Sequence, residues 1–381
     1  MRLIASVLGL LVIASGVAPA PHARAQRLVY IGTYTEKTAS KGIYAFRFDD
    51  GTGALTAVGL VAETPSPSFL TASANGRFVY AVNELQTFGG EPSGSVTAFA
   101  VDPASAKLTE LNVQSTKGAA PCHLVLDKSG RFLAVANYSG GNYSLFPVGS
   151  DGRLQAAATV VAGKPADGAG AKALGHMVGF DAQNKYLITA DKGLNQMLVF
   201  RFDSKSGQLT LNDTPPVMLP PGSGPRHYAF HPSGRWVFTI NEQGATITTF
   251  AWDAKTGGLT ARSSVPTRPA EVKTGSTAEI HAHKSGRFVF GSNRGHDSIV
   301  VFAIDQNSGR LTYLENRPTQ GSTPRGFGID PSGSYLLAAN QRSDSVVVFR
   351  IDKQTGRLTP TGHTIEVGAP VCVKFVERRN R

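Results

Sequence analysis

One turn pattern recurs seven times along this chain and limits what it can fold into. Each copy has an acidic or small residue, a short polar turn, usually a Gly, one variable residue and then Leu, most often followed by Thr. Successive leucines are 46 to 55 residues apart, at Leu55, Leu108, Leu154, Leu209, Leu259, Leu311 and Leu358. A period of this length is typical of architectures that use one supersecondary unit several times.

The segments around each turn have the pattern of short β-strands. Alternating β-branched and aromatic residues precede the turns, as at residues 43–48, 298–304 and 345–351. A second apolar strand follows a Ser-Gly-Arg-aromatic motif and ends near Asn, at residues 76–83, 130–137, 234–241, 286–293 and 333–340, with a degenerate copy at 184–191. A strand of small residues comes before each of these, at residues 67–73, 122–127, 176–181, 226–231, 279–283, 325–330 and 371–376. Each repeat thus supplies four antiparallel strands and no crossover helix.

The two ends of the repeat array complete one another. The strand at 371–376 has no partner after it, whereas residues 28–34 supply such a partner with no strand before it. We therefore predict an all-β, seven-bladed β-propeller of four-stranded antiparallel blades, closed by pairing the N- and C-terminal segments in one blade. A solenoid is the alternative, but its two free ends would need caps.

The N-terminal segment predicts export. Arg2, an apolar run at residues 3–18 and small residues ending at Ala25 form a secretory signal pattern, cut after Ala25. The run is short for a membrane span and contains Ser and Gly. We predict a signal peptide at 1–25 and a single propeller domain at 26–381, periplasmic or secreted, with no stable membrane insertion after cleavage. An uncleaved anchor is the alternative.

Charge and cysteine content narrow the partners. The formal net charge of +11 favours anionic ligands, but the basic residues are scattered and form no aromatic-interleaved stripe, so no nucleic acid partner is predicted. Cys122 and Cys372 begin equivalent strands in non-adjacent repeats, too far apart in a ring for a disulfide. We predict free, partly buried thiols.

Candidate site residues gather at two repeat positions that converge at one end of the propeller axis. At the starts of inner strands the sequence has His123, His176, Arg226, His227, Glu279, His281 and Arg325. After second strands it has Glu84, Tyr138, Glu242, Arg294, His296 and Gln341. Such a set of Arg, His and Glu predicts an anion site with acid–base chemistry. We expect substrate contacts from His123, His227, Glu279, His281, His296 and Arg325. A structural role in tying blades together is the alternative for His123, His227, Glu84 and Asn293.

No cofactor or metal is predicted. No spacing of His, Cys and carboxylate residues amounts to a metal signature. His281 and His283 are expected to face opposite sides of their strand and so to be poor joint ligands.

The motifs at these positions resemble one known family over essentially the whole mature chain. They are YIGTYT (30–35), PCH (121–123) with VANY (135–138), GPRH (224–227) with NE (241–242), AEI (278–280) with SNRGHDS (292–298), and PR (324–325) with ANQ (339–341). In combination they are similar to the bacterial 6-phosphogluconolactonase and carboxymuconate cyclase family. That resemblance implies a seven-bladed propeller, in agreement with the repeat count.

The resemblance also implies site residues. In the muconate-cyclising relatives a His, two Arg and a Glu are proposed to line the site, and by motif these fall on His176, Arg226, Glu242 and Arg294. Relatives commonly carry a His-Pro-His run where this chain has Ala-Leu-Gly before His176, and His281 replaces a residue of another type, which could alter substrate choice.

The expected function is hydrolysis of a sugar lactone by a carboxylic ester hydrolase similar to 6-phosphogluconolactonase. Glu242 or His176 is expected to act as general base or acid, while Arg226 and Arg294 hold negative charge. Predicted export favours an unphosphorylated aldonolactone. Two alternatives stay open: a noncatalytic extracytoplasmic binding propeller and a muconate cycloisomerase-type enzyme.

Overall fold

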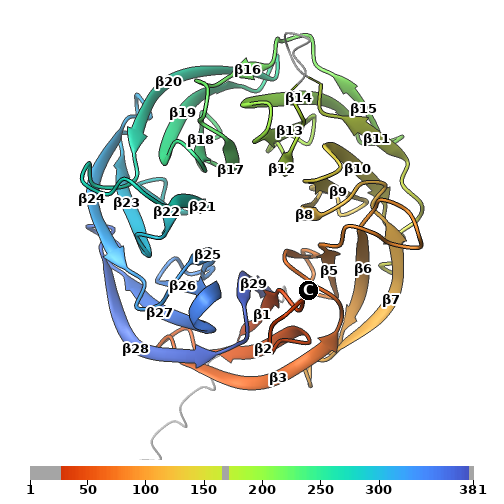
Figure 1. Cartoon of the computed structure of the whole chain (residues 1–381), viewed down its shortest axis with the longest axis horizontal. Helices are drawn as coiled ribbons and strands as arrows, with labels where there is room; N and C mark the ends of the chain where they lie inside the picture. Colours follow the sequence, from red (N-terminus) through yellow and green to blue (C-terminus); the bar gives the residue numbers. More distant parts are fainter. Residues whose placement is uncertain (1–26, 165–170, 377–381) are drawn as a thin grey trace, which may run out of the picture.

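The computed structural model describes residues 27–164 and 171–376, and within them the strands form seven antiparallel sheets arranged in a ring (Figure 1). The predicted signal peptide at 1–25 lies outside the described residues. The innermost strands contact one another in turn, and the last contacts the first. In ring order they are β29 (Pro370–Val376), β4 (Leu70–Ala72), β8 (Pro121–Leu126), β12 (Gly175–Phe180), β17 (Pro225–Phe230), β21 (Ser276–Ala282) and β25 (Pro324–Ile329). The predicted seven-bladed propeller is confirmed.

Each blade continues outward through three more strands. The second strands are β1 (Arg27–Thr33), β5 (Phe78–Asn83), β9 (Phe132–Asn137), β13 (Tyr186–Asp191), β18 (Trp236–Asn241), β22 (Phe288–Arg294) and β26 (Tyr335–Asn340). The third strands are β2 (Gly42–Phe48), β6 (Ser95–Val101), β10 (Asn142–Pro147), β14 (Gln196–Asp203), β19 (Thr246–Asp253), β23 (Ser298–Ile304) and β27 (Ser345–Ile351). The outer strands are β3 (Leu55–Glu63), β7 (Leu108–Ser115), β11 (Thr159–Ala162), β15 (Gln208–Leu211) with the added β16 (Val217–Met218), β20 (Gly258–Pro266), β24 (Leu311–Pro318) and β28 (Leu358–Glu366).

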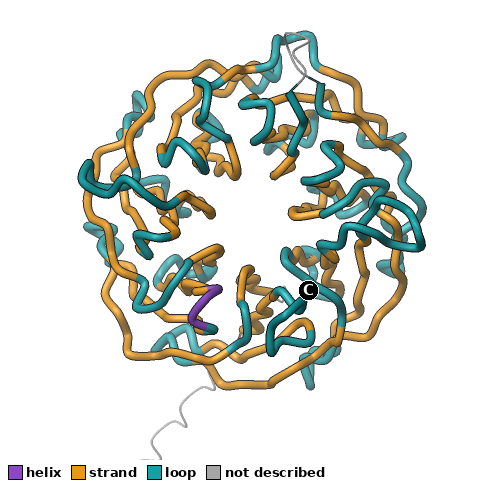
Figure 2. Tube along the Cα trace, in the orientation of Figure 1, coloured by secondary structure: helices purple, strands orange, loops and turns teal. Residues whose placement is uncertain are grey.

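Strands and loops make up almost all of the ring (Figure 2). The helical content of the described residues is one 3₁₀ turn, η1 (Gln341–Ser343). Over the same residues no helix has the length and apolar character to cross a membrane.

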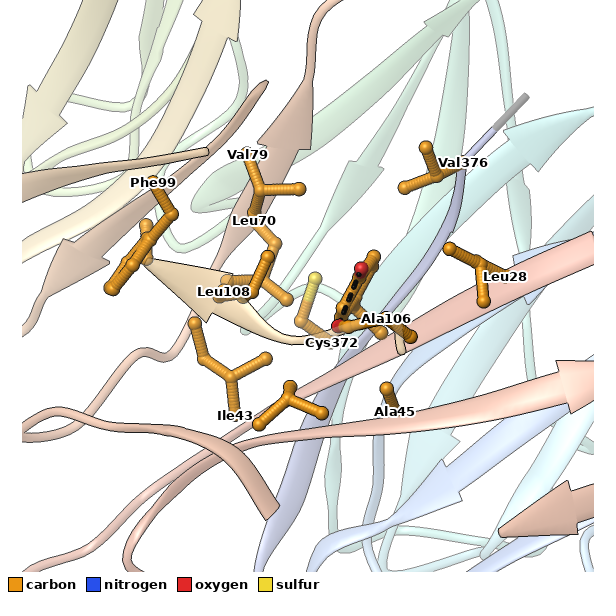
Figure 3. Close-up of a cluster of buried hydrophobic side chains, with 13 residues drawn as sticks. Leu28, Ile43, Ala45, Leu70, Val79, Phe99, Ala106, Leu108, Cys372 and Val376 are labelled. Atoms are coloured by element: carbon orange, nitrogen blue, oxygen red, sulfur yellow. Dashed lines mark hydrogen bonds between the residues drawn. The ribbon is translucent and has the colours of Figure 1, made fainter. Parts of the chain in front are cut away.

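The closing blade has the predicted composition, because β29 from the C-terminus pairs with β1 from the N-terminus. Their register places Leu28 opposite Val376 and Gly32 opposite Cys372. The side chains of Leu28, Cys372 and Val376 join a buried apolar cluster that reaches into the next blade through Leu70 (Figure 3). Burial of this apolar surface stabilises the closed ring. Both cysteines are free, as predicted, and both are buried rather than partly buried.

The two motifs that define the repeat meet at the interfaces between blades. At each of six interfaces a turn glycine with positive φ lies against the aromatic ring that begins the second strand of the neighbouring blade. The pairs are Gly53 with Tyr335, Gly152 with Phe78, Gly207 with Phe132, Gly257 with Tyr186, Gly309 with Trp236, and Gly356 with Phe288. At the seventh interface, Ala106 occupies the turn, and its carbonyl accepts a hydrogen bond of 3.0 Å from the Tyr30 hydroxyl. This hydrogen bond is the dashed line in Figure 3.

We expect Gly309→Ala to lower the free energy of unfolding by about 3 kcal/mol. A Cβ at this position would lie 2.6 Å from Trp236 Cδ2, and the backbone φ of +70° disfavours any L side chain. Gly130→Ala is the matched control, because its φ is +71° and a Cβ there would meet nothing within 4 Å. The control should lose only about 1 kcal/mol in urea denaturation. Equal losses for the two variants would contradict a packing role for the turn glycine.

Two strands differ from their predicted bounds. The inner strand expected at 67–73 is shorter, since β4 begins at Leu70, after Pro67 and after Ser66 with its positive φ of 39°. In the third repeat Leu154 makes only an isolated bridge to Val148, and β11 begins at Thr159. The shortened turn before Leu154 explains this delay, because it leaves no residues for a longer hairpin ladder.

Candidate active site

A β-bulge sits at the start of nearly every inner strand and turns one side chain away from the regular alternation. In β17, for example, Pro225 pairs with Asn241 and His227 with Ile240, so Arg226 is left out of register. Bulges of this kind re-aim side chains and are common beside active sites. The equivalent residues, which we call the first ring, are Ser68, Cys122, His176, Arg226, Glu279, Arg325 and Val371.

A second ring comes from the ends of the second strands. Its members are Tyr34, Glu84, Tyr138, Lys192, Glu242, Arg294 and Gln341. Six of them donate their backbone N–H to a carbonyl two residues before a first-ring residue, as Glu242 does to Gly224 at 2.7 Å. Gly224 has a φ of +64°, which turns its carbonyl toward this donor. The backbone therefore holds the second ring beside the first.

Where the two rings meet, one carboxylate is surrounded by three cations. Glu242 Oε1 lies 2.6 Å from Lys192 Nζ, and Glu242 Oε2 lies 3.0 Å from Arg226 Nε and 3.2 Å from Arg294 Nη2. We call these four residues the Glu242 cluster. Arg226 is buried, with 3% of its side chain exposed, whereas the other three are 14–15% exposed. A ligand can therefore reach Glu242, Lys192 and Arg294. Arg226 is buried and contacts Glu242 through an ion pair.

Hydrogen bonds to the backbone hold the two arginines of the cluster. Arg226 Nη1 donates to the Ala278 carbonyl at 2.8 Å, and Arg294 Nη2 donates to the Thr277 carbonyl at 2.7 Å. Arg294 Nε is buried and has no hydrogen-bond partner among the described residues. The cluster is thus rigidly placed, yet it keeps an unused donor.

The charges of the cluster shift its pKa values. Burial tends to raise the pKa of Glu242, but Arg226, Arg294 and Lys192 outweigh it and lower the pKa to about 2. Burial and the neighbouring Arg226 lower the pKa of Arg294 to about 10, so it stays protonated at neutral pH. At neutral pH the cluster holds one negative and three positive charges, an excess of positive charge suited to an anion or an oxyanion.

His176 lies next to the cluster through an aromatic contact. Its ring centroid is 5.5 Å from that of Tyr138, whose hydroxyl is 3.3 Å from Lys192 Nζ. Burial and the charge of Arg226 lower the pKa of His176 well below its usual value, so the imidazole is neutral. A neutral imidazole can accept a proton.

The opposite side of the two rings carries a second polar group. Glu84 Oε2 accepts hydrogen bonds from the Tyr34 hydroxyl at 2.9 Å and the Ser68 hydroxyl at 2.5 Å. The Arg325 guanidinium lies over the Tyr34 ring at 5.2 Å. Burial tends to lower the pKa of Arg325, but the neighbouring Tyr34 hydroxyl and Glu84 carboxylate outweigh it and raise the pKa. Arg325 therefore adds a further fixed positive charge to this end of the channel.

The other expected substrate contacts lie away from the Glu242 carboxylate. The first-ring residue Glu279 is bonded to His227, with 3.0 Å between Oε1 and Nδ1, and both side chains are nearly buried. His123 stacks against Phe69 and lies farther along the channel. None of these three described residues makes a hydrogen bond or ion pair with Glu242.

His281 and His296 are also apart from the Glu242 cluster. His281 Nε2 donates a hydrogen bond to the Phe327 carbonyl, 3.0 Å away. His296 Nδ1 lies 2.7 Å from the Ser298 hydroxyl and 3.4 Å from the Asn316 amide, on the outward side of its blade.

Lys192 was missing from the candidates found in the sequence. It follows Asp191 at the end of the degenerate second strand, the position that holds Glu242 and Arg294 in other repeats. The position of Lys192 in the repeat could have identified it as a site residue. This repeat, however, lacks the Ser-Gly-Arg motif and the terminal Asn that mark the position in other repeats.

The expectation that His281 and His283 face opposite sides was wrong. Both bond to carbonyls of the same neighbouring blade, of Phe327 and Gly333 respectively, because residues two apart in a strand share a face. Across residues 27–164 and 171–376 no three His, Cys, Asp or Glu side chains are grouped so that they could hold a metal ion.

Comparison with known proteins agrees with this architecture. The model of the family described as lactonase, seven-bladed β-propeller, matches residues 28–375. The chain belongs to this lactonase family. It is 35% identical over 352 residues to a protein of Bacillus subtilis strain 168 named 6-phosphogluconolactonase, covering 92% of this chain and 98% of the relative.

Two other proteins are also similar to this chain over most of its length. A protein of Formosa agariphila named 6-phosphogluconolactonase is 34% identical over 310 residues, covering 80% of this chain and 86% of the relative. The solved structure of the periplasmic gluconolactonase PpgL of Pseudomonas aeruginosa has a TM-score of 0.86 at 32% identity, covering 93% of this chain and 100% of that one. The likeness therefore extends around the whole ring.

Proposed function

We propose that this chain hydrolyses a sugar lactone at the Glu242 cluster. The observation that carries the proposal is the Glu242 carboxylate held by Lys192, Arg226 and Arg294 beside the neutral His176. Lactone hydrolysis needs a base for the attacking water and positive charge for the oxyanion that forms on the carbonyl oxygen. The cluster contains both within hydrogen-bond distance of one another.

The accessible members of the cluster have distinct roles in this reaction. Arg294 and Lys192 bind the lactone carbonyl oxygen and stabilise the negative charge that develops when water adds to the carbonyl carbon. Drawing these cations toward the substrate weakens their hold on Glu242, which raises its basicity and lets it take the proton of the attacking water. The carbonyl then re-forms and the ring C–O bond breaks, while protonated Glu242 returns its proton to the leaving ring oxygen, which becomes a hydroxyl. The carboxylic acid that results ionises to a carboxylate and releases a proton to the solvent. Arg226 is a positioning residue, because it is buried behind the carboxylate it bonds.

We further propose that the substrate is an unphosphorylated aldonolactone. The predicted signal peptide at 1–25 supports this, since the phosphorylated lactone of central sugar metabolism is a cytoplasmic compound. The likeness to a protein named periplasmic gluconolactonase supports it as well. The same positive charges would also hold a substrate phosphate, so charge alone does not discriminate between the two substrates.

The test is a comparison of two lactones under one assay. Proton release would be followed at constant pH with glucono-δ-lactone and with 6-phosphoglucono-δ-lactone, subtracting the spontaneous rate measured with heat-denatured protein. We expect catalysis with both, and a kcat/KM for the unphosphorylated lactone at least ten times that for the phosphorylated one. A reversed preference would refute the substrate proposal. No acceleration with either would refute lactone hydrolysis and favour a binding propeller.

A further inference from the structure

A second cavity lies in the channel beyond the first ring, and nothing in the lactonase reaction uses it. The space enclosed by the first ring is only about 10 Å³, and its walls include Arg226, Glu279 and Arg325. Farther along the inner strands the channel widens into a cavity of about 310 Å³. We call this the distal cavity. The narrow section separates it from the Glu242 cluster, so a molecule in it would enter from the other face of the ring.

The wall of the distal cavity is mostly apolar. Aromatic and thioether side chains from four blades line it, namely Phe69 just before β4, Met177 and Phe180 on β12, Phe230 on β17 and Phe327 on β25. A cavity of this size with apolar walls and a few polar groups is typical of small-molecule sites. The apolar body of a ligand of about the size of one aromatic ring would be buried here.

One cation on this wall has no ion-pair partner. Lys374, on β29, is partly buried and makes no hydrogen bond or ion pair with any described residue, and the one carboxylate of the wall, Glu279, is bonded to His227 instead. Burial lowers its pKa. An ammonium group withdrawn from water without a partner is costly, and a bound anion removes that cost.

The other polar groups on the wall are compatible with an anion near Lys374. His123 is buried, and its Nδ1 has no hydrogen-bond partner among the described residues. The carboxylate of Glu279 is engaged by His227 Nδ1 and by the Ile280 amide, each at 3.0 Å. His281 is engaged by the Phe327 carbonyl. Among the ionisable side chains of the described wall, Lys374 has no partner and His123 keeps an unused ring nitrogen.

We propose that the distal cavity binds a small organic carboxylate with an apolar body, of the size of benzoate. The carboxylate lies at Lys374, and the apolar body packs against the phenylalanines. Neither feature suffices alone, because inorganic anions gain nothing from the aromatic wall and neutral aromatic molecules leave the ammonium unpaired. This site is separate from the proposed lactonase site and does not depend on it.

Binding would be measured by isothermal titration calorimetry on the full chain at low ionic strength, with benzoate, benzyl alcohol and inorganic phosphate as probes. We expect benzoate to bind at least ten times more tightly than either of the others. Lys374→Met keeps the length of the side chain and removes its charge, and should weaken benzoate binding at least tenfold. The control is Lys284→Met, an exposed lysine outside the distal cavity whose Nζ bonds the Pro331 carbonyl, and it should bind as the unaltered chain does.

Two further measurements keep the proposal falsifiable if Lys374→Met does not fold. Benzoate should protect Lys374, and not Lys284, from amine acylation mapped by mass spectrometry. Arg294→Ala should leave benzoate binding unchanged, since Arg294 belongs to the Glu242 cluster. Loss of binding in Arg294→Ala without protection of Lys374 would place the anion at the other end of the channel and overturn the proposal. Equal binding of benzyl alcohol would overturn it too.

Discussion

Replacing Glu242 by Gln lowers kcat/KM for lactone hydrolysis at least a hundredfold. The amide keeps the shape of the side chain but cannot take the proton of the attacking water, and loss of one positioned acid–base group costs roughly 10²–10⁴-fold in rate. Arg294→Ala should cause a loss of at least a hundredfold as well, because it removes an accessible donor for the oxyanion. Initial rates of proton release, corrected for spontaneous hydrolysis, measure both.

The matched control for this pair is Glu315→Gln. Glu315 is also a nearly buried carboxylate held by two arginines, with Oε2 at 2.9 Å from Arg317 Nη2 and 3.6 Å from Arg357 Nη1. It lies on the outer strand β24, away from the channel. Breaking its ion pairs should lower the melting temperature without changing kcat/KM. Wild-type rates in Glu242→Gln or Arg294→Ala would refute the assigned roles.

The pH dependence gives a second readout of the same carboxylate. Because the pKa of Glu242 is lowered to about 2, the group stays ionised as the pH falls from 7 to 4. The kcat/KM corrected for spontaneous hydrolysis should therefore show no acid limb over this interval. The stability that the ion pairs provide is present above the ordinary Glu pKa and is lost as the pH falls toward 2. An acid limb with a midpoint near pH 6.5 would instead indicate a histidine with an unshifted pKa.

Ending the chain after Gly368 abolishes the cooperatively folded ring. The truncation removes β29, which pairs with β1 and packs against β25 and β4. Its buried Val371, Val373 and Val376 alone account for about 5–9 kcal/mol, comparable to the total stability of a typical domain. Thermal melting followed by circular dichroism, together with size-exclusion chromatography, would show an expanded or aggregated chain.

Two further measurements complete the truncation test. A chain ending after Val376 retains β29 and should melt as the full chain does. Adding a peptide of residues 369–376 to the shorter chain should restore a cooperative transition in proportion to its concentration, because the peptide supplies the missing inner strand. A sharp, unchanged melting transition in the chain ending at Gly368 would mean that closure by the two termini does not hold the ring together.

Local patterns in the sequence were sufficient for the architecture. The turn leucines set the number of blades, and the unpaired segments at 28–34 and 371–376 identified the closing blade. The predicted starts of the inner strands also identified His176, Arg226, Glu279 and Arg325, which are members of the first ring. Such features are encoded within a few residues, so repeats that share them fold alike.

The degenerate repeat and the ends of strands were less predictable. Lys192 was not among the predicted site residues because its repeat lacks the usual motif, although its position in the fold is equivalent to that of Glu242. His281 and His123 could be assigned to the channel, but how deep they lie depends on the register after each bulge. A register shift changes which side chains lie at the same depth in the channel, and no local sequence pattern predicts that shift.

The sequence by itself determined a closed seven-fold ring and the two repeat positions whose side chains converge on its axis, because hydrophobic alternation and turn chemistry act over a few residues. Only the tertiary structure decided that Glu242 is bonded by Lys192, Arg226 and Arg294, and that Lys374 lines a mostly apolar cavity without an ion-pair partner. Lys192, Glu242 and Arg294 come from three different blades, and their distances and pKa values arise only when packing of the ring brings their charges together away from water.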